Sequence, residues 1–135
     1  MRETPADYLF QSLTHSRPVA FTKNNYEKHI PRHPYIAGKD GLAKIEEALL
    51  NPSVITRYTQ SPHIPKARRR CQAFYKILKR RDIGNGKFLL DYWQVIMIEN
   101  KAHRRWEIAT VLAGEDSPEY AMINTKIETT LHDYR

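Results

Sequence analysis

The sequence predicts an α+β domain in which N-terminal helices pack on one face of a four-stranded antiparallel sheet. The chain has 135 residues, of which 41% are hydrophobic, and this suffices for one domain with one core. Apolar residues recur at helical spacing before Pro52, whereas β-branched and aromatic residues form extended runs after it. Short turn signals separate the later runs, so neighbouring strands are expected to run antiparallel.

The first expected helix covers residues 24–32. Asn24 precedes Glu27 by three residues, which is the spacing of a capping box at a helix start. Pro31 limits or kinks this helix, because proline lacks the backbone N–H that the helix interior needs.

A second helix is expected over residues 40–50. Leu42, Ile45 and Leu49 recur three and four residues apart and form one apolar stripe that would pack on the sheet together with Ile30. The helix should end before Pro52, since the residue preceding a proline disfavours helical backbone.

Four strands are expected in the second half of the chain. The third of them is apolar at both parities, as in a central strand that is covered on both faces. The turn at residues 84–86, Gly-Asn-Gly, is a strong hairpin signal between the second and third strands. The helices would cover one face of the sheet and leave the other available for binding. The expected strands are residues 54–59, 70–79, 88–99 and 106–112.

The ends of the chain are expected to lie outside the domain proper. We divide the chain into an N-terminal extension (1–20), the domain (21–113) and a C-terminal tail (114–135), which can form a helix with Pro118 at its first position. Neither a signal peptide nor a membrane segment is recognisable, so the cytoplasm is the expected compartment. The single cysteine, Cys71, excludes an internal disulfide and a cysteine-built metal site, and it is expected to be buried.

The distribution of charge points to a polyanionic partner. The chain carries 22 Lys and Arg against 15 Asp and Glu, with a net charge of +7. Between Arg57 and Arg105 there are thirteen cations and three acids, whereas the rest of the chain has nine cations and twelve acids. Such segregation is what binding to a phosphate backbone requires, although a solvated basic face without a partner has the same pattern. The cations expected to contact nucleic acid are Arg57, Arg68, Arg69, Arg70, Lys79, Arg80, Arg81, Arg104 and Arg105.

Two imidazoles and a guanidinium lie within five residues, at His29, Arg32 and His33. Histidine exchanges protons near neutral pH, and an arginine can hold a phosphate with two hydrogen bonds. The group would suit RNA cleavage without a metal, in which a base deprotonates the ribose 2′-OH and an acid protonates the leaving oxygen. The alternative is structural, with one histidine at a helix end and the other in solvent. A zinc pair is the weakest interpretation, because the Glu of the H-E-x-x-H motif is absent and Pro31 intervenes.

Several motifs together resemble the phage and mobile-element nucleases of the barnase, EndoU, colicin E5/D and RelE fold group. They are H-I-x-x-R-H-P at the end of the first helix, ALLNPSVI at the end of the second, the strand pair FYKIL and QVIMI, and the last strand WEIATVL. The likeness covers residues 21–112. It implies a barnase-like or RelE-like sheet and metal-independent ribonuclease activity.

The resemblance also implies roles for individual residues. His29, Arg32 and His33 match the helix motif, and Thr110 matches a polar residue of the last strand. Tyr75 and Lys76 fall on the strand that contacts phosphate in such folds. We expect a histidine to act as base or acid, Arg32 and Lys76 to stabilise the phosphate, and Tyr75 and Thr110 to orient it.

The leading functional hypothesis is a toxin or effector ribonuclease that cleaves RNA by attack of a 2′-OH, with no cofactor and no metal. Its expected partners are RNA, either tRNA or mRNA, and an inhibitor protein, and no membrane is expected. The first alternative is a non-catalytic nucleic-acid-binding module of a phage or mobile element. The second is a structural protein whose basic sheet docks an acidic partner. Only the first hypothesis predicts EDTA-resistant cleavage that leaves 2′,3′-cyclic phosphate ends.

Overall fold

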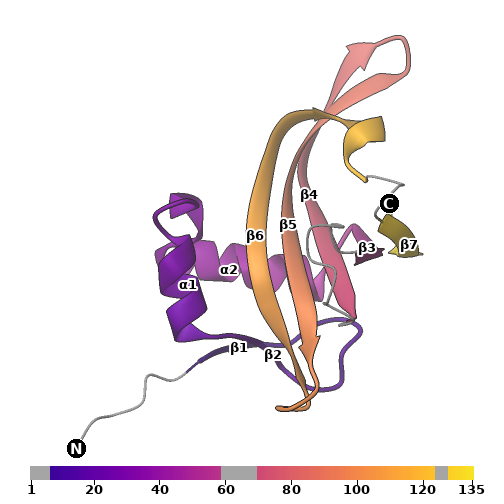
Figure 1. Ribbon diagram of the computed structural model, residues 1–135. Coiled ribbons are helices and arrows are strands. Elements are labelled where there is room, and N and C mark those ends of the chain that lie inside the picture. Colours follow the sequence, from indigo (N-terminus) through magenta and orange to yellow (C-terminus); the bar gives the residue numbers. More distant parts are fainter. Residues whose placement is uncertain (1–6, 59–69, 124–127) are drawn as a thin grey trace, which may run out of the picture.

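The computed structural model describes residues 7–58, 70–123 and 128–135. These residues form a seven-stranded mixed sheet that curls into a half-barrel, together with two α-helices (Figure 1). The strand order is β1-β2-β6-β5-β4-β3-β7. The predicted fold, a four-stranded antiparallel sheet under N-terminal helices, is therefore wrong, because three further strands join the sheet and one pairing is parallel.

The four strands expected from the sequence form the middle of this sheet as an antiparallel meander. Strand β5, which is apolar at both parities, is central, with three strands on each side. The expected hairpin turn forms at residues 84–86, and Asn85 and Gly86 both have positive φ, at 56° and 71°, as a two-residue turn requires. The bounds of the four strands are β3 Val54–Tyr58, β4 Cys71–Gly84, β5 Lys87–Asn100 and β6 Arg105–Pro118.

The three additional strands come from the segments that the sequence sets apart. β1 (Tyr8–Phe10) and β2 (Val19–Phe21) form an antiparallel pair, and β2 joins β6 in parallel at Ala20 and Glu107. β7 (Glu128–Asp133) pairs with β3 at the opposite edge. Three-residue strands are too short to show a period of two, and an exposed edge strand needs no apolar face.

The first helix, α1 (Lys23–His29), starts earlier than the capping-box spacing indicates. Its N-cap is Thr22, whose Oγ1 accepts a hydrogen bond of 3.2 Å from the backbone N–H of Asn25. Asn24 is therefore inside the helix rather than at its cap. The second helix, α2 (Gly38–Leu50), follows the short 3-10 turn η1 (Pro34–Ile36) and ends before Asn51 and Pro52 as expected.

The C-terminal segment is extended for most of its described length. After Pro118 it makes one 3-10 turn, η2 (Glu119–Ala121), in place of the helix that Pro118 suggested. The strand β7 then follows. No helix in the described ranges is long and apolar enough to cross a membrane.

Both faces of the sheet carry a buried apolar cluster. Helix α2 packs Ile45 and Leu49 on the first face, against Phe74, Val95 and their neighbours, and we call this side the helix face. The second cluster lies on the opposite face, where Met122, which follows η2, covers part of the sheet. The expectation that the second face stays open for binding is corrected by this cluster.

Candidate functional site

The structure brings His29 and His33 together beside strand β6. The two rings are stacked, with centroids 5.9 Å apart and an interplanar angle of 21°. His29 is the last residue of α1, and His33 follows one helical turn later. Pro31, which lies between them, does not keep the two rings apart.

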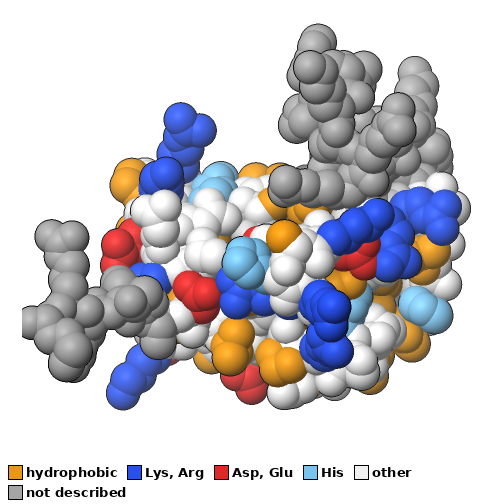
Figure 2. Space-filling view, turned by 60° about the horizontal axis from the view of Figure 1, so that its bottom comes forward, with side chains coloured by type: hydrophobic (Ala, Val, Ile, Leu, Met, Phe, Trp, Pro, Cys, Tyr) orange, Lys and Arg blue, Asp and Glu red, His pale blue; other side chains and the backbone are white. Residues whose placement is uncertain are grey.

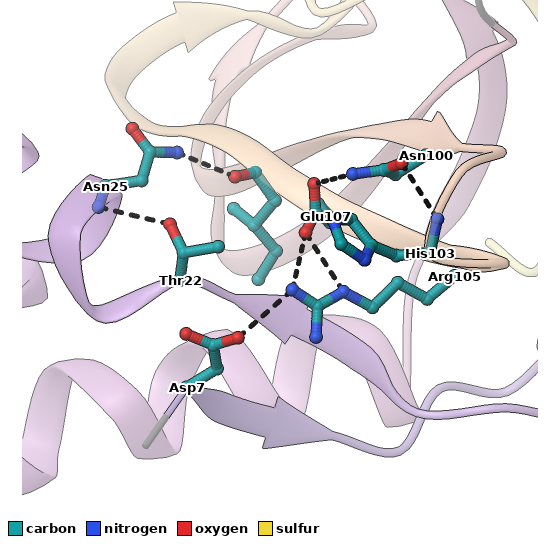
Figure 3. A network of polar contacts seen from close by, with 8 residues as sticks. Asp7, Thr22, Asn25, Asn100, His103, Arg105 and Glu107 are labelled. Atoms are coloured by element: carbon teal, nitrogen blue, oxygen red, sulfur yellow. Dashed lines mark hydrogen bonds and ion pairs between the residues drawn. The ribbon is translucent and has the colours of Figure 1, made fainter. Parts of the chain in front are cut away.

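Hydrogen bonds fix which nitrogen of His29 is available. Its Nδ1 lies 2.9 Å from the carbonyl oxygen of Asn25, so Nδ1–H donates and Nε2 is left for chemistry. The Asn25 side chain in turn donates from Nδ2 to the carbonyl of Ile108 on β6, at 2.9 Å. The contact between Asn25 and Ile108 anchors α1 to β6, and Figure 3 shows it together with the Thr22 cap of the helix.

Tyr35 orients His33 in the same way. The Nδ1 of His33 lies 2.8 Å from the hydroxyl of Tyr35, which accepts from the backbone N–H of Ala113 at 3.1 Å and donates to the carbonyl of Val111 at 3.3 Å. When Nδ1–H of His33 donates to the Tyr35 hydroxyl, each donor and acceptor in this set of hydrogen bonds has a partner, and Nε2 of His33 is left available. Sequence reasoning missed Tyr35, although its position two residues after His33 was a usable signal.

Electrostatics keep His33 neutral more readily than an isolated histidine. Partial burial lowers its pKa, and the charges of His29 and Arg32 lower it further. The lowered pKa therefore suits His33 to act as a base near neutral pH.

Further cationic and aromatic groups lie next to Tyr35. Its ring packs edge-to-face on Trp93, with centroids 5.3 Å apart, and the Nζ of Lys44 lies 5.5 Å from the Trp93 ring centre. Trp93 is buried. Lys44 of α2 was not among the predicted site residues.

Lys76 does not reach the histidine pair. Its ammonium donates to the carbonyl of Asn51 at 2.9 Å and lies 3.4 Å from a carboxylate oxygen of Glu47. It therefore caps the C-terminal end of α2, where a cation is favoured by the helix dipole.

Tyr75 and Thr110 lie on the other face of the sheet. Their cross-strand partners are Gln94 and Ile96, and paired residues point to the same face. Ile96 and Tyr75 both belong to the second apolar cluster. Tyr75 is 1% exposed and accepts a 2.7 Å hydrogen bond from Gln94, so it has no surface to offer a substrate. Among the predicted catalytic residues, the structure thus gathers His29, Arg32 and His33 and separates the other three.

The predicted nucleic-acid-binding cations divide into two groups. Arg70, Arg104 and Arg105 lie near the β5–β6 turn, and Arg57 pairs in register with Gln72 near the same end. Lys79, Arg80 and Arg81 lie in the projecting half of the β4–β5 hairpin, about 30 Å away along β4. Arg68 and Arg69 lie outside the described residues. We call the first region the turn end and the second the hairpin arm, which projects at the top of Figure 1.

Ion pairs occupy the arginines of the hairpin arm. Arg80 bonds to Glu119 at 3.1 Å and lies over the ring of Phe88, with its guanidinium carbon 3.5 Å from the ring centre. Arg81 bonds to Asp116 at 2.8 Å. These acids come from β6 and η2, so the arginines tie the arm to its neighbours.

At the turn end, a polar network holds the base of β6 in place. Arg105 is clamped between Asp7, at 3.0 Å, and Glu107, at 2.7 Å. Asn100 donates to Glu107 at 2.8 Å and accepts from the backbone of His103 (Figure 3). Figure 2, which turns this end toward the reader, shows Lys and Arg side chains gathered on one side of it.

A cavity of about 360 Å³ opens at the turn end. A larger one of about 720 Å³ lies between the hairpin arm and the C-terminal segment, away from both histidines. Among the described residues, no group of three or more His, Cys, Asp or Glu is arranged to hold a metal. The smaller cavity is lined by His15, Ser16, Arg17, Glu99, Asn100, Lys101, Arg104, Arg105 and Trp106.

The comparisons with known proteins add nothing to this geometry. No protein-family model, no curated protein and no solved structure matches the chain.

Proposed function

We propose that the protein is a metal-independent endoribonuclease whose reacting groups are His29 and His33, with Arg32 beside them. The stacked pair carries this proposal, because both rings have Nδ1 engaged and Nε2 available. The resemblance of H-I-x-x-R-H-P to the nuclease motif supports it independently of the fold. The cytoplasm stays the expected compartment, and tRNA or mRNA the expected substrate.

The chemistry requires one neutral and one protonated imidazole. The neutral ring, for which His33 is the better candidate because its pKa is lowered, takes the proton of the ribose 2′-OH. The 2′-oxygen then attacks phosphorus, and the guanidinium of Arg32 stabilises the added negative charge. His29 gives its proton to the departing 5′-oxygen. The products are a 2′,3′-cyclic phosphate and a free 5′-hydroxyl.

Purified protein incubated with tRNA and mRNA in EDTA tests the proposal. Cleavage with 2′,3′-cyclic phosphate ends is expected, and His29→Ala or His33→Ala should lower its rate about a hundredfold to ten-thousandfold. His132→Ala is the matched control, because His132 is an exposed histidine on β7 at the far edge of the sheet. Cleavage that survives both alanine variants would contradict the assignment.

A non-catalytic nucleic-acid-binding module is the second candidate. Its specific support is the set of cations at the turn end, where Arg17, Lys101 and Arg104 form no ion pair with any carboxylate of residues 7–58, 70–123 or 128–135. Salt-dependent RNA binding without cleavage by the wild-type protein would favour this candidate.

A further inference from the structure

The cavity at the turn end is built from two segments far apart in the sequence. Residues 15–17 lie between β1 and β2, whereas residues 99–106 form the β5–β6 turn and its flanks. The guanidinium of Arg17 donates to the carbonyl of Arg104 at 3.1 Å and so joins the two segments. At about 360 Å³, the cavity falls in the size range of small-molecule sites.

The cations that line the cavity or lie beside it are of two kinds. Arg105 and Arg70 are neutralised locally, Arg105 by Asp7 and Glu107 and Arg70 by Glu99. Arg17, Lys101 and Arg104, in contrast, form no ion pair within the described part of the chain. These three charges therefore remain available to an anion that enters the cavity.

The backbone of Arg104 is held in an unusual conformation. Its φ of 52° lies in the left-handed region, which is strained for a residue that carries a Cβ atom. A glycine or an asparagine would fit this turn position better. The chain instead has a cation here, and its carbonyl accepts the hydrogen bond from Arg17.

The cavity also has an aromatic wall. His15 and Trp106 pack together with ring centroids 5.0 Å apart and an interplanar angle of 56°. Nε2 of His15 bonds to the side-chain oxygen of Gln72 at 2.8 Å, which fixes the ring. Aromatic surface beside unpaired cations is the combination that binds a nucleobase together with its phosphate.

We propose that this cavity binds one nucleotide of a single-stranded RNA, with its phosphate on Lys101, Arg104 and Arg17 and its base against the wall of Trp106 and His15. This inference builds on the proposed function, because it names a place where the substrate is held apart from the reacting histidines. The shared ligand chemistry is that of a nucleoside monophosphate, either free in solution or within an RNA chain.

The cavity and the histidine pair lie on the same side of the sheet. His15 contacts Phe74 and His29 contacts Phe21, and both phenylalanines belong to the cluster on the helix face. Along β6, Val111, which bonds to Tyr35, lies six positions after Arg105 at the cavity. An RNA chain would therefore have to extend about 20 Å from the point of cleavage to reach the cavity.

Titration with a nucleoside monophosphate tests the site without any cleavage. The indole N–H signals in the NMR spectrum of the isotope-labelled protein report on it, because one of the two tryptophans lines the cavity and the other, Trp93, is buried elsewhere. AMP and UMP should shift the Trp106 signal and leave that of Trp93 in place. Adenosine and inorganic phosphate, offered separately, should each bind at least tenfold more weakly.

Variants then test the cations. Lys101→Ala and Arg104→Gly should each weaken AMP binding about tenfold, because each loses a charge-assisted hydrogen bond. Lys87→Ala is the matched control, since Lys87 is an exposed lysine on the hairpin arm with no ion pair among the described residues. RNA binding by the inactive His33→Ala variant should show the same order of effects.

The outcomes separate this inference from the proposed function. If no nucleotide shifts the Trp106 signal, or if Lys87→Ala weakens binding as much as Lys101→Ala, the nucleotide site is overturned even where RNA is cleaved. If inorganic phosphate binds as tightly as AMP, the proposed contact of the base with Trp106 and His15 is overturned. AMP binding that follows the expected order supports the site, whether or not the histidines cleave RNA.

Discussion

The turn end and the hairpin arm both combine paired arginines with cations that form no ion pair, but they differ in how many carboxylates lie beside the cations. In the arm, Arg80 and Arg81 are bonded to carboxylates of η2 and β6, and Arg80 also lies on Phe88. At the turn end, Arg70 and Arg105 are paired in the same way. Lys101 and Arg104 form no ion pair among the described residues, and the same holds for Lys79 and Lys87 of the arm. The number of basic residues in a segment is therefore a poor guide to a polyanion site, whereas the balance of cations and carboxylates around them is a better one.

The physical reason is that a paired cation has already lost much of its attraction for a distant phosphate. The arm and the adjoining parts of β5, β6 and η2 carry at least as many carboxylates as the arm has cations, and two of these carboxylates bond to its arginines. These cations are Lys79, Arg80, Arg81 and Lys87, and the carboxylates are those of Asp82, Asp91, Glu115, Asp116 and Glu119. We infer that the arm's arginines mainly hold β6 and η2 against the hairpin.

The largest expected effect comes from reversing charge at each end. The double variant Lys101→Glu, Arg104→Glu should weaken RNA binding about a hundredfold or more, because two charge-assisted contacts are lost. The double variant Lys79→Glu, Lys87→Glu on the arm should weaken it only a few fold. Fluorescence anisotropy of a labelled RNA over a range of salt concentrations measures both. Equal losses of RNA affinity in the two double variants would contradict the proposed difference between the turn end and the hairpin arm.

A second prediction separates binding from chemistry. Tyr35→Phe removes the hydroxyl that orients His33, so the cleavage rate should fall between tenfold and a hundredfold while RNA affinity is unchanged. The matched control is Tyr120→Phe, since Tyr120 is 85% exposed on η2. A drop in affinity as large as the drop in rate would mean that Tyr35 contributes to binding rather than to positioning.

A third prediction concerns pH. Burial lowers the pKa of His33 first, and the charges of His29 and Arg32 add to the effect. Arg32→Ala removes one of these charges, so the pKa of His33 should rise and the acidic limb of the pH–rate profile should move to higher pH. Lys39→Ala, an exposed cation at the start of α2, should leave the limb in place. A shift to lower pH would exclude His33 as the base.

The smallest expected effects are on stability. Arg81→Ala should lower the free energy of unfolding by about 0.2–1 kcal/mol, as is usual for an exposed ion pair. Arg104→Gly should not lower it, because relief of about 1–2 kcal/mol of left-handed strain offsets the larger entropy of the unfolded chain. Urea unfolding of both variants measures the difference. Marked destabilisation by Arg104→Gly would show that this side chain is structural.

The sequence predicted the middle of the fold better than its edges. The long strands and α2 have apolar patterns imposed by burial on a known period, and they form where those patterns indicate. The edge strands β1 and β7 have no such pattern, because few of their side chains are buried. The N-cap of α1 was misplaced since Thr22 and Asn24 are both good capping residues, and only the tertiary contacts of Asn25 distinguish them.

For the candidate site, the local part was predictable and the non-local part was not. His29, Arg32 and His33 lie within one helical turn, so their proximity follows from the sequence. Placing Tyr75 and Thr110 required the strand parity and the position of the bulge in β6. The pairing of β6 with β5 shifts at this bulge, between Ile96 and Met97 of β5. The cavity at the turn end depends on the β1–β2 connection, which the sequence assigned to an extension.

Because the single cysteine is buried, its alkylation rate can report on local opening of the sheet. Cys71 is 3% exposed at the start of β4, and burial raises the pKa of its thiol to about 11. Only the thiolate reacts with alkylating reagents, so at pH 8 about one molecule in a thousand would hold the reactive form in the closed sheet. Labelling of Cys71 then requires β4 to separate from its neighbouring strands, and the labelling rate measures the frequency of this local unfolding.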